Sequence, residues 1–181
     1  MNPVVTKLQG VLPGVKAWIE HTLEIHRAAA VSVSKSAYTR LRDHYPDALL
    51  ARARVVVVPE IPFPPLSQLG IPELEAMETM PLAGVTYKDT FFVSAGQQRE
   101  SLYFHELVHV AQWDRLGVDN FLLAYAIGLF QHGYQQSPLE QMAYQLQAAF
   151  DQQRVPRNLV EFINEQTDRA WYAAEQALKA G

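Results

Sequence analysis

Helical sequence fills the second half of this 181-residue chain, and this feature constrains the fold more than any other. From about Arg99 onward, apolar side chains recur at the three- and four-residue spacing that is typical of helices with one buried face. Gly117, Gly133 and the pair Val155-Pro156 interrupt the pattern, as helix-ending residues do. The sequence therefore predicts four consecutive helices, over residues 99–115, 119–131, 138–153 and 157–179.

One further helix is expected near the N-terminus. Residues 15–45 carry apolar side chains at helical spacing, Pro13-Gly14 marks the expected start, and a break is expected in the Ala-, Val- and Ser-rich stretch 28–36. Residues 59–72 contain five prolines with apolar residues between them. This composition favours an ordered loop that wraps around the body over a flexible linker.

Two segments predict strands. The four valines Val55–Val58, closed by Pro59, are typical of a buried strand. Gly84–Val93 is rich in Thr, Tyr, Phe and Val, with a turn expected at Lys88-Asp89. Because helical sequence far exceeds strand sequence, the expected fold class is α+β, a small β-sheet layer packed by a predominantly helical body.

Composition excludes several classes of protein. The net charge of −4 and the pI of about 5.8 give no basic patch for nucleic acid. With no cysteine, a metal site must use His, Asp or Glu. The longest apolar stretch, Phe121–Phe130, is half of the about 20 residues that a membrane span needs. No signal peptide is visible in residues 1–13, so a cytoplasmic protein is expected.

The strongest functional signal is His105-Glu106-Leu107-Val108-His109, an H-E-x-x-H motif inside the first C-terminal helix. Residues four apart in a helix lie about 40° apart around its axis, so His105 and His109 share a face and can hold one metal ion. Glu106 lies about 100° from His105, off the metal but within reach of a water bound to it. Two neutral histidines beside a carboxylate base suit zinc hydrolysis.

The motif is unlike a chance occurrence, because a shuffled chain of this composition would contain it about 0.013 times. Its neighbours Leu107, Val108 and Val110 give the helix a broad apolar face. Burying two histidines and a glutamate there is costly unless they are paired or bound to metal. The alternative is a helix with two surface histidines and a coincidental glutamate.

A catalytic zinc site needs a third protein ligand. The metzincin extension of the motif requires Gly at 112 and His at 115, but the chain has Gln112 and Arg115, which excludes that class. The remaining downstream donors are Asp114, Asp119, His132, Glu140 and Asp151.

Glu140 is the preferred third ligand. It lies on a new helix, and the short intervening helix 119–131 can return the chain so that this helix crosses near the first. Two alternatives stay open. Ser137 and Glu140 have the spacing of a capping box, in which Glu140 would only cap the helix backbone. His132, near a helix end, is the rival ligand.

These residues give the chain a resemblance to a known family. The stretch His105 to Trp113 (HELVHVAQW), followed by a glutamate in Pro138 to Tyr144 (PLEQMAY), is similar to small gluzincin-type, zincin-like metallopeptidases, over about residues 84–150. The resemblance implies a zincin-like fold with the motif on a central helix. It also implies a Zn²⁺ ion bound by His105, His109 and Glu140, with Glu106 as the base.

The length of 181 residues fits one domain. We therefore expect a single zincin-like domain over 1–181, with an N-terminal helix, strand and proline-rich loop (1–83), a metal-site core (84–153) and a C-terminal helix (154–181). In such folds the strand before the motif helix, here 85–93, lines the cleft and pairs with extended peptide or protein substrate, although an ordinary edge strand is the alternative.

One position departs from the family. Thermolysin-like gluzincins have an aspartate four residues after the ligand glutamate, where this chain has Tyr144, so the partner that orients a zinc histidine is unassigned.

The expected mechanism is zinc-assisted hydrolysis of peptide bonds. Zinc would lower the pKa of its water to about 7, and Glu106 would take the proton and pass it to the leaving amine. Tyr134, six residues before Glu140, is the candidate donor to the oxyanion, and a packed aromatic at a helix end is the alternative. His132 and Tyr144 are weaker candidates for that role.

Two other functions stay open. One is a catalytically inactive zincin-like domain that acts as a protein-binding module. The other is a helical interaction module without metal, in which Trp113, Phe121, Tyr125 and Phe130 are simply core. Intact Glu106 favours the enzyme, because a metal site kept only for structure needs no base. The sequence predicts no oligomeric state.

Overall fold

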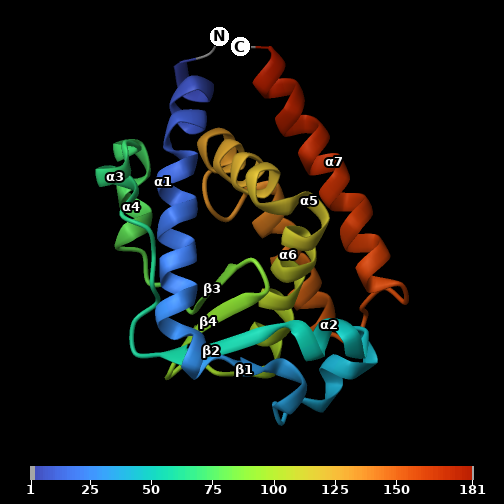
Figure 1. Cartoon of the computed structure of the whole chain (residues 1–181). Coiled ribbons are helices and arrows are strands. Elements are labelled where there is room, and N and C mark those ends of the chain that lie inside the picture. Colours follow the sequence, from blue (N-terminus) through green and yellow to red (C-terminus); the bar gives the residue numbers. More distant parts are fainter. Residues whose placement is uncertain (1–2, 181) are drawn as a thin grey trace.

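Helices make up most of the molecule (Figure 1). The computed structural model describes residues 3–180. In this part of the chain the α-helices are α1 (Pro3–His26), α2 (Asp47–Arg52), α3 (Leu66–Leu69), α4 (Glu75–Glu78), α5 (Glu100–His132), α6 (Pro138–Asp151) and α7 (Leu159–Lys179). Short 3-10 turns are η1 (Arg27–Ala29), η2 (Val33–Lys35), η3 (Thr39–Asp43) and η4 (Pro72–Leu74).

Strands β1 (Val31–Ser32), β2 (Arg54–Val58), β3 (Gly84–Tyr87) and β4 (Thr90–Ser94) form one sheet in the order β1-β2-β4-β3. Both predicted strand segments are confirmed, and the second is a hairpin that turns at Lys88-Asp89. β2 and β4 run parallel, and parallel neighbours need a long connection. The proline-rich segment 59–72 lies in that connection and includes α3, so it is an ordered part of the fold.

The N-terminal helix differs from its prediction at both ends. Pro13 lies inside α1, so the expected start at Pro13-Gly14 was wrong. A proline inside a helix removes a backbone hydrogen bond, but Leu8 and Ile19 on either side of it are buried in the core, and this packing stabilises the helix across it. The continuation to residue 45 was also wrong, because 3-10 turns and β1 occupy the stretch after His26.

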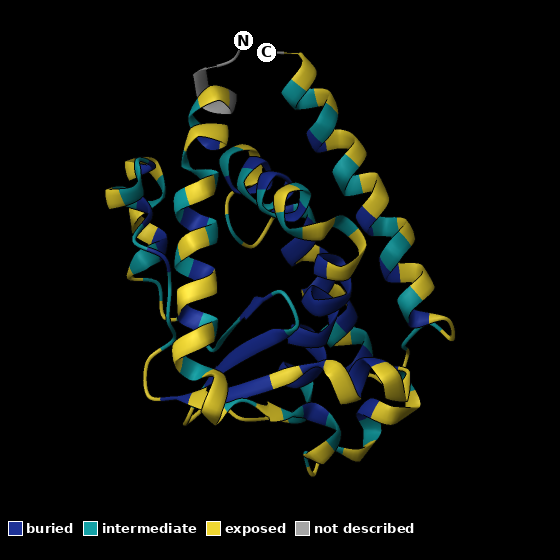
Figure 2. Ribbon diagram, in the orientation of Figure 1, coloured by how far each residue is buried: buried dark blue, intermediate teal, exposed yellow. Residues whose placement is uncertain are grey.

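The C-terminal helices agree closely with the sequence. α5 spans two of the predicted helices, and the break between them is confirmed at Gly117, whose φ of 73° is outside the helical range. α6 and α7 both pack against α5. The buried residues of Figure 2 gather on the sheet and on the adjoining half of α5, while the outer faces of α1 and α7 are exposed.

The fold class is therefore α+β, as predicted, with a small sheet at one end of a mainly helical body (Figure 1). One continuous apolar core includes Leu8 of α1, Phe92 of β4, Leu107 of α5 and Ile163 of α7. Across residues 3–180, no helix combines the length and the apolar character that crossing a bilayer requires.

Candidate metal centre

The H-E-x-x-H motif lies on the buried first half of α5. Every residue from Leu102 to Trp113 is buried, because this half of the helix lies against the β3–β4 hairpin on one side and α6 and α7 on the other. His105, Glu106 and His109 are 4%, 2% and 5% exposed. The alternative of two surface histidines is therefore excluded.

Three side chains from two helices converge at this point. The Nε2 atoms of His105 and His109 are 3.2 Å apart. Glu140, on the first turn of α6, places Oε1 at 3.4 Å from Nε2 of His109 and Oε2 at 3.5 Å from Nε2 of His105. One ligand atom from each residue lies within 4.8 Å of the others, so this buried group could hold a metal ion.

The polar atoms of the group fit a divalent cation. Glu140 Oε2 is buried and accepts no hydrogen bond from any described residue. The two imidazole Nε2 atoms face each other, and a neutral imidazole pair can share only one hydrogen between them. A cation bound by both nitrogens and the carboxylate would satisfy all three groups, and this donor set is one that zinc takes.

The two alternatives for the third ligand find no support in the geometry. Ser137 caps α6 without a side-chain hydrogen bond, and its backbone N–H donates to the carbonyl of Tyr134, so the capping box is not formed. His132 is exposed at the end of α5 and is not part of the converging group. Glu140 is instead the third member of the group that could hold a metal ion, together with His105 and His109.

Without metal, the group carries a positive charge on His109 and a negative charge on Glu140. Burial alone would lower the pKa of His109, but the carboxylate of Glu140 outweighs it and raises that pKa to about 9. Burial likewise disfavours the Glu140 anion, yet the two histidines lower its pKa below the usual range. Without metal, the pair is therefore a buried ion pair.

Glu106 lies beside this group, with its carboxylate against the edge strand β3. The Thr86 hydroxyl donates to its Oε2 at 2.7 Å. A Cβ on Gly84 would lie 2.5 Å from its Oε1, so only glycine leaves room for the carboxylate there. Burial raises the pKa of Glu106, partly offset by the two nearby histidines. This suits a group that must take up a proton.

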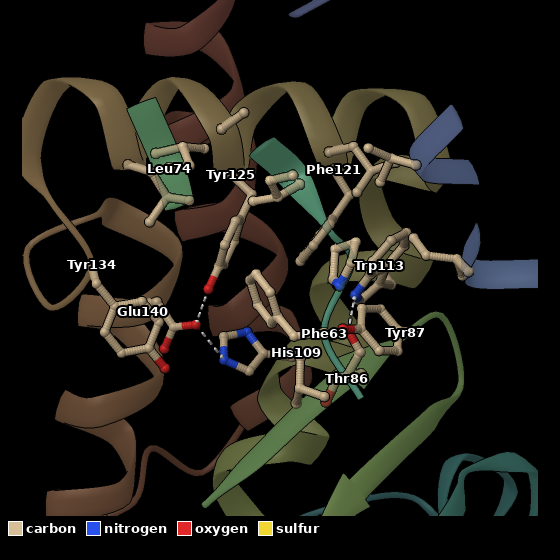
Figure 3. A pocket seen from close by; sticks show the side chains of 18 of the residues that line it. Phe63, Leu74, Thr86, Tyr87, His109, Trp113, Phe121, Tyr125, Tyr134 and Glu140 are labelled. Carbon is tan, nitrogen blue, oxygen red and sulfur yellow. Dashed lines mark hydrogen bonds and ion pairs between the residues drawn. The ribbon is translucent and has the colours of Figure 1, made fainter. Parts of the chain in front are cut away.

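Two residues that were not predicted to belong to the site contact the ligands. Gln112 accepts from Nδ1 of His109 at 2.8 Å, and the Tyr125 hydroxyl donates to Glu140 Oε1 (Figure 3). Gln112 could have been found, because it lies three residues after His109 on the same helical face. Tyr125 had no local signal, since it approaches from beyond the kink at Gly117.

Tyr134 and Tyr144, two of the candidate oxyanion donors, lie close to the ligands. Tyr134 is half-buried and lies beside Glu140 in Figure 3. Burial raises the pKa of its hydroxyl, with Glu140 adding to the effect, so the hydroxyl keeps its proton. The Tyr144 ring lies 4.7 Å from the ring of His105. Tyr144 therefore packs on a histidine from the position where thermolysin-like enzymes have an aspartate.

A cavity of about 120 Å³ adjoins the group. Its walls are overwhelmingly apolar, and the polar residues His105, Glu106, His109 and Glu140 lie together at it. One wall is the inner face of α1, which contributes Leu8, Val11, Leu12, Val15 and Ile19. The N-terminal helix, which was not predicted to take part in the site, thus lines the cavity beside the metal group.

Comparison with known proteins gives no assignment. No protein-family model, curated protein or solved structure matches the chain.

Proposed function

We propose that this chain is a zinc-dependent metallopeptidase of the zincin-like, gluzincin type. The observation that carries the proposal is the convergence of His105, His109 and Glu140 with Glu106 held beside them. Two imidazoles and one carboxylate are the ligand set of several catalytic zinc sites, and such sites leave the fourth position for water or substrate.

When bound, zinc would supply a water of lowered pKa and a charge that polarises the scissile carbonyl. Glu106 would be the residue that takes the proton of that water and delivers it to the departing amine. Its raised pKa strengthens it as a base, and the Thr86 hydroxyl fixes the direction of its carboxylate. Glu106 is therefore the catalytic base of the proposal.

Tyr134 is the donor that we assign to the developing oxyanion. Its hydroxyl is protonated, and the ring lies beside Glu140, on the opposite side from Thr86, the residue that holds Glu106 (Figure 3). A donor opposite the base is where an oxyanion needs a hydrogen bond.

Strand β3 offers an edge for an extended peptide. Ser94 N–H donates to the carbonyl of Ala83, so the alternation of an antiparallel pair turns the backbone groups of Gly84 and Thr86 away from β4. The Trp113 indole already donates to the Thr86 carbonyl. Gly84, next to Glu106, is therefore the position at which a substrate strand would pair.

Access to Glu106 would require a wall of the cavity to move, and α1 is one of these walls. Glu106 is 2% exposed, and the inner face of α1 forms a wall of the cavity. Exposed ion pairs join Lys16 of α1 to Asp119, and Glu20 to Lys88. The same burial favours the alternative function, a catalytically inactive zincin-like domain that binds a protein partner through another surface.

Elemental analysis and one substitution test the proposal. The purified protein should hold one zinc per chain and cleave members of a mixed peptide library. Glu106→Gln should keep the zinc and the fold but lose cleavage by at least about 100-fold, whereas the surface control Glu165→Gln should behave as wild type. A wild-type protein that binds zinc but cleaves nothing would leave the binding module as the better interpretation.

A further inference from the structure

We propose that Gln112 is the positioning residue of the metal centre, which fixes His109 and joins the two helices that carry the ligands. The inference rests on the metal-binding part of the proposed function and not on peptide cleavage. It also fills the role that the departure at Tyr144 left unassigned.

The amide of Gln112 is completely buried and uses both of its ends. Its Nε2 donates to the Leu139 carbonyl at 3.0 Å, and its Oε1 lies 2.8 Å from Nδ1 of His109. The Leu139 carbonyl can only accept, so the nitrogen of the amide must face it. The oxygen of the amide must then face His109, where it can only accept.

This chain of contacts determines where the hydrogen of His109 lies. Because Gln112 Oε1 accepts, Nδ1 of His109 must carry a hydrogen and donate it. In the neutral ring, Nε2 then keeps its lone pair, and Nε2 is the atom that faces His105 and Glu140. Gln112 thereby selects the tautomer that can bind a metal and sets the direction of the ring.

The other end of Gln112 acts on the third ligand. Leu139 directly precedes Glu140 on the first turn of α6, so a bond from α5 to its carbonyl fixes that turn relative to His109. One side chain therefore links His109 to the turn that carries Glu140, its partner in the 3.4 Å contact.

His105 is held differently. Its Nδ1 is buried and has no hydrogen-bond partner among the described residues, and its ring packs against Tyr144. The effect of Gln112 should therefore be specific to His109. An apolar residue would pack at a completely buried position at lower cost, which argues that the amide serves the metal centre.

Zinc affinity of the full chain tests the assignment, measured by competition with a chromophoric chelator. Gln112→Met keeps the length of the side chain and removes both bonds, and should weaken zinc binding about 10- to 100-fold. Gln112→Glu keeps an acceptor for His109 and should bind zinc at least about tenfold more tightly than Gln112→Met. Gln145→Met and Gln145→Glu, on the exposed face of α6, are the controls and should match wild type.

Nuclear magnetic resonance of the zinc-loaded protein gives a readout that a purely structural role would not change. Wild type should show a slowly exchanging Nδ1 proton for His109, which Gln112→Met loses and Gln112→Glu keeps. Wild-type zinc affinity in Gln112→Met, or no protected Nδ1 proton in wild type, would overturn the assignment. Absence of zinc binding in wild type overturns it together with the proposed function, whereas zinc binding without peptide cleavage refutes the peptidase alone.

Discussion

Gly84 offers a way to displace the proposed base without touching a metal ligand. A Cβ at this position would lie 2.5 Å from Glu106 Oε1, whereas ordinary contacts begin near 3.4 Å, so the oxygen must move by their difference, about 0.9 Å. The strand cannot simply shift away, because the Phe92 carbonyl is 3.2 Å from the same Cβ. Rotation of the carboxylate would strain the hydrogen bond from Thr86.

Gly84→Ala should therefore lower kcat/KM about 100-fold, the usual effect of displacing a catalytic group by about 1 Å. Zinc affinity should stay within about twofold of wild type, since His105, His109 and Glu140 are untouched. Peptide-library cleavage and chelator competition measure the two quantities. Gly96→Ala, where a Cβ meets nothing within 4 Å, is the control. A Gly84→Ala enzyme with wild-type kcat/KM would refute the role of Glu106 and of its position.

Three other contacts carry predictions of their own. Tyr125→Phe removes the donor to Glu140 and should weaken zinc binding about tenfold by chelator competition; no change would mean that the hydroxyl only packs. Zinc must displace the proton of His109, whose pKa is raised to about 9, so apparent affinity should strengthen about tenfold per pH unit from pH 7 and level off near pH 9. That proton stabilises the metal-free fold below pH 6.5, and the stabilisation should be lost as pH rises through about 9, seen as a falling melting temperature. Lys16→Glu removes the exposed pair with Asp119, worth about 0.2–1 kcal/mol, so hydrogen exchange in α1 should quicken by up to about fivefold.

Local pattern was enough to predict most of the elements. Apolar spacing located α5, α6 and α7, and β-branched and aromatic runs located β2 and the β3–β4 hairpin. The error at Pro13 has a physical cause: the rule that proline ends a helix describes local energetics, while α1 is stabilised by tertiary packing of Leu8 and Ile19.

The site residues also fall into two groups, those whose placement follows from local spacing and those whose placement depends on tertiary packing. His105, Glu106 and His109 are fixed by one turn of helix, so their relative placement follows from spacing alone. Glu140 could be preferred from its place on the chain but not separated from a capping residue, because that depends on where α6 crosses α5. Tyr125 depends in addition on the direction that α5 takes after Gly117, which no local pattern specifies.

The position of α1 along the cavity was the feature that the sequence pattern could least predict. It also bears most directly on function, because the cavity adjoins the metal group. An apolar helical face has the same sequence pattern whether it packs on solid core or lines a cavity, so the sequence did not indicate that Leu12 and Val15 line the cavity beside the metal group. The ion pairs of α1, such as that of Lys16 with Asp119, are exposed and weak. The apolar face of α1 therefore contributes most of the free energy that holds the helix in place. An apolar substrate segment could replace those contacts, which makes displacement of α1 by the substrate the natural route to Glu106.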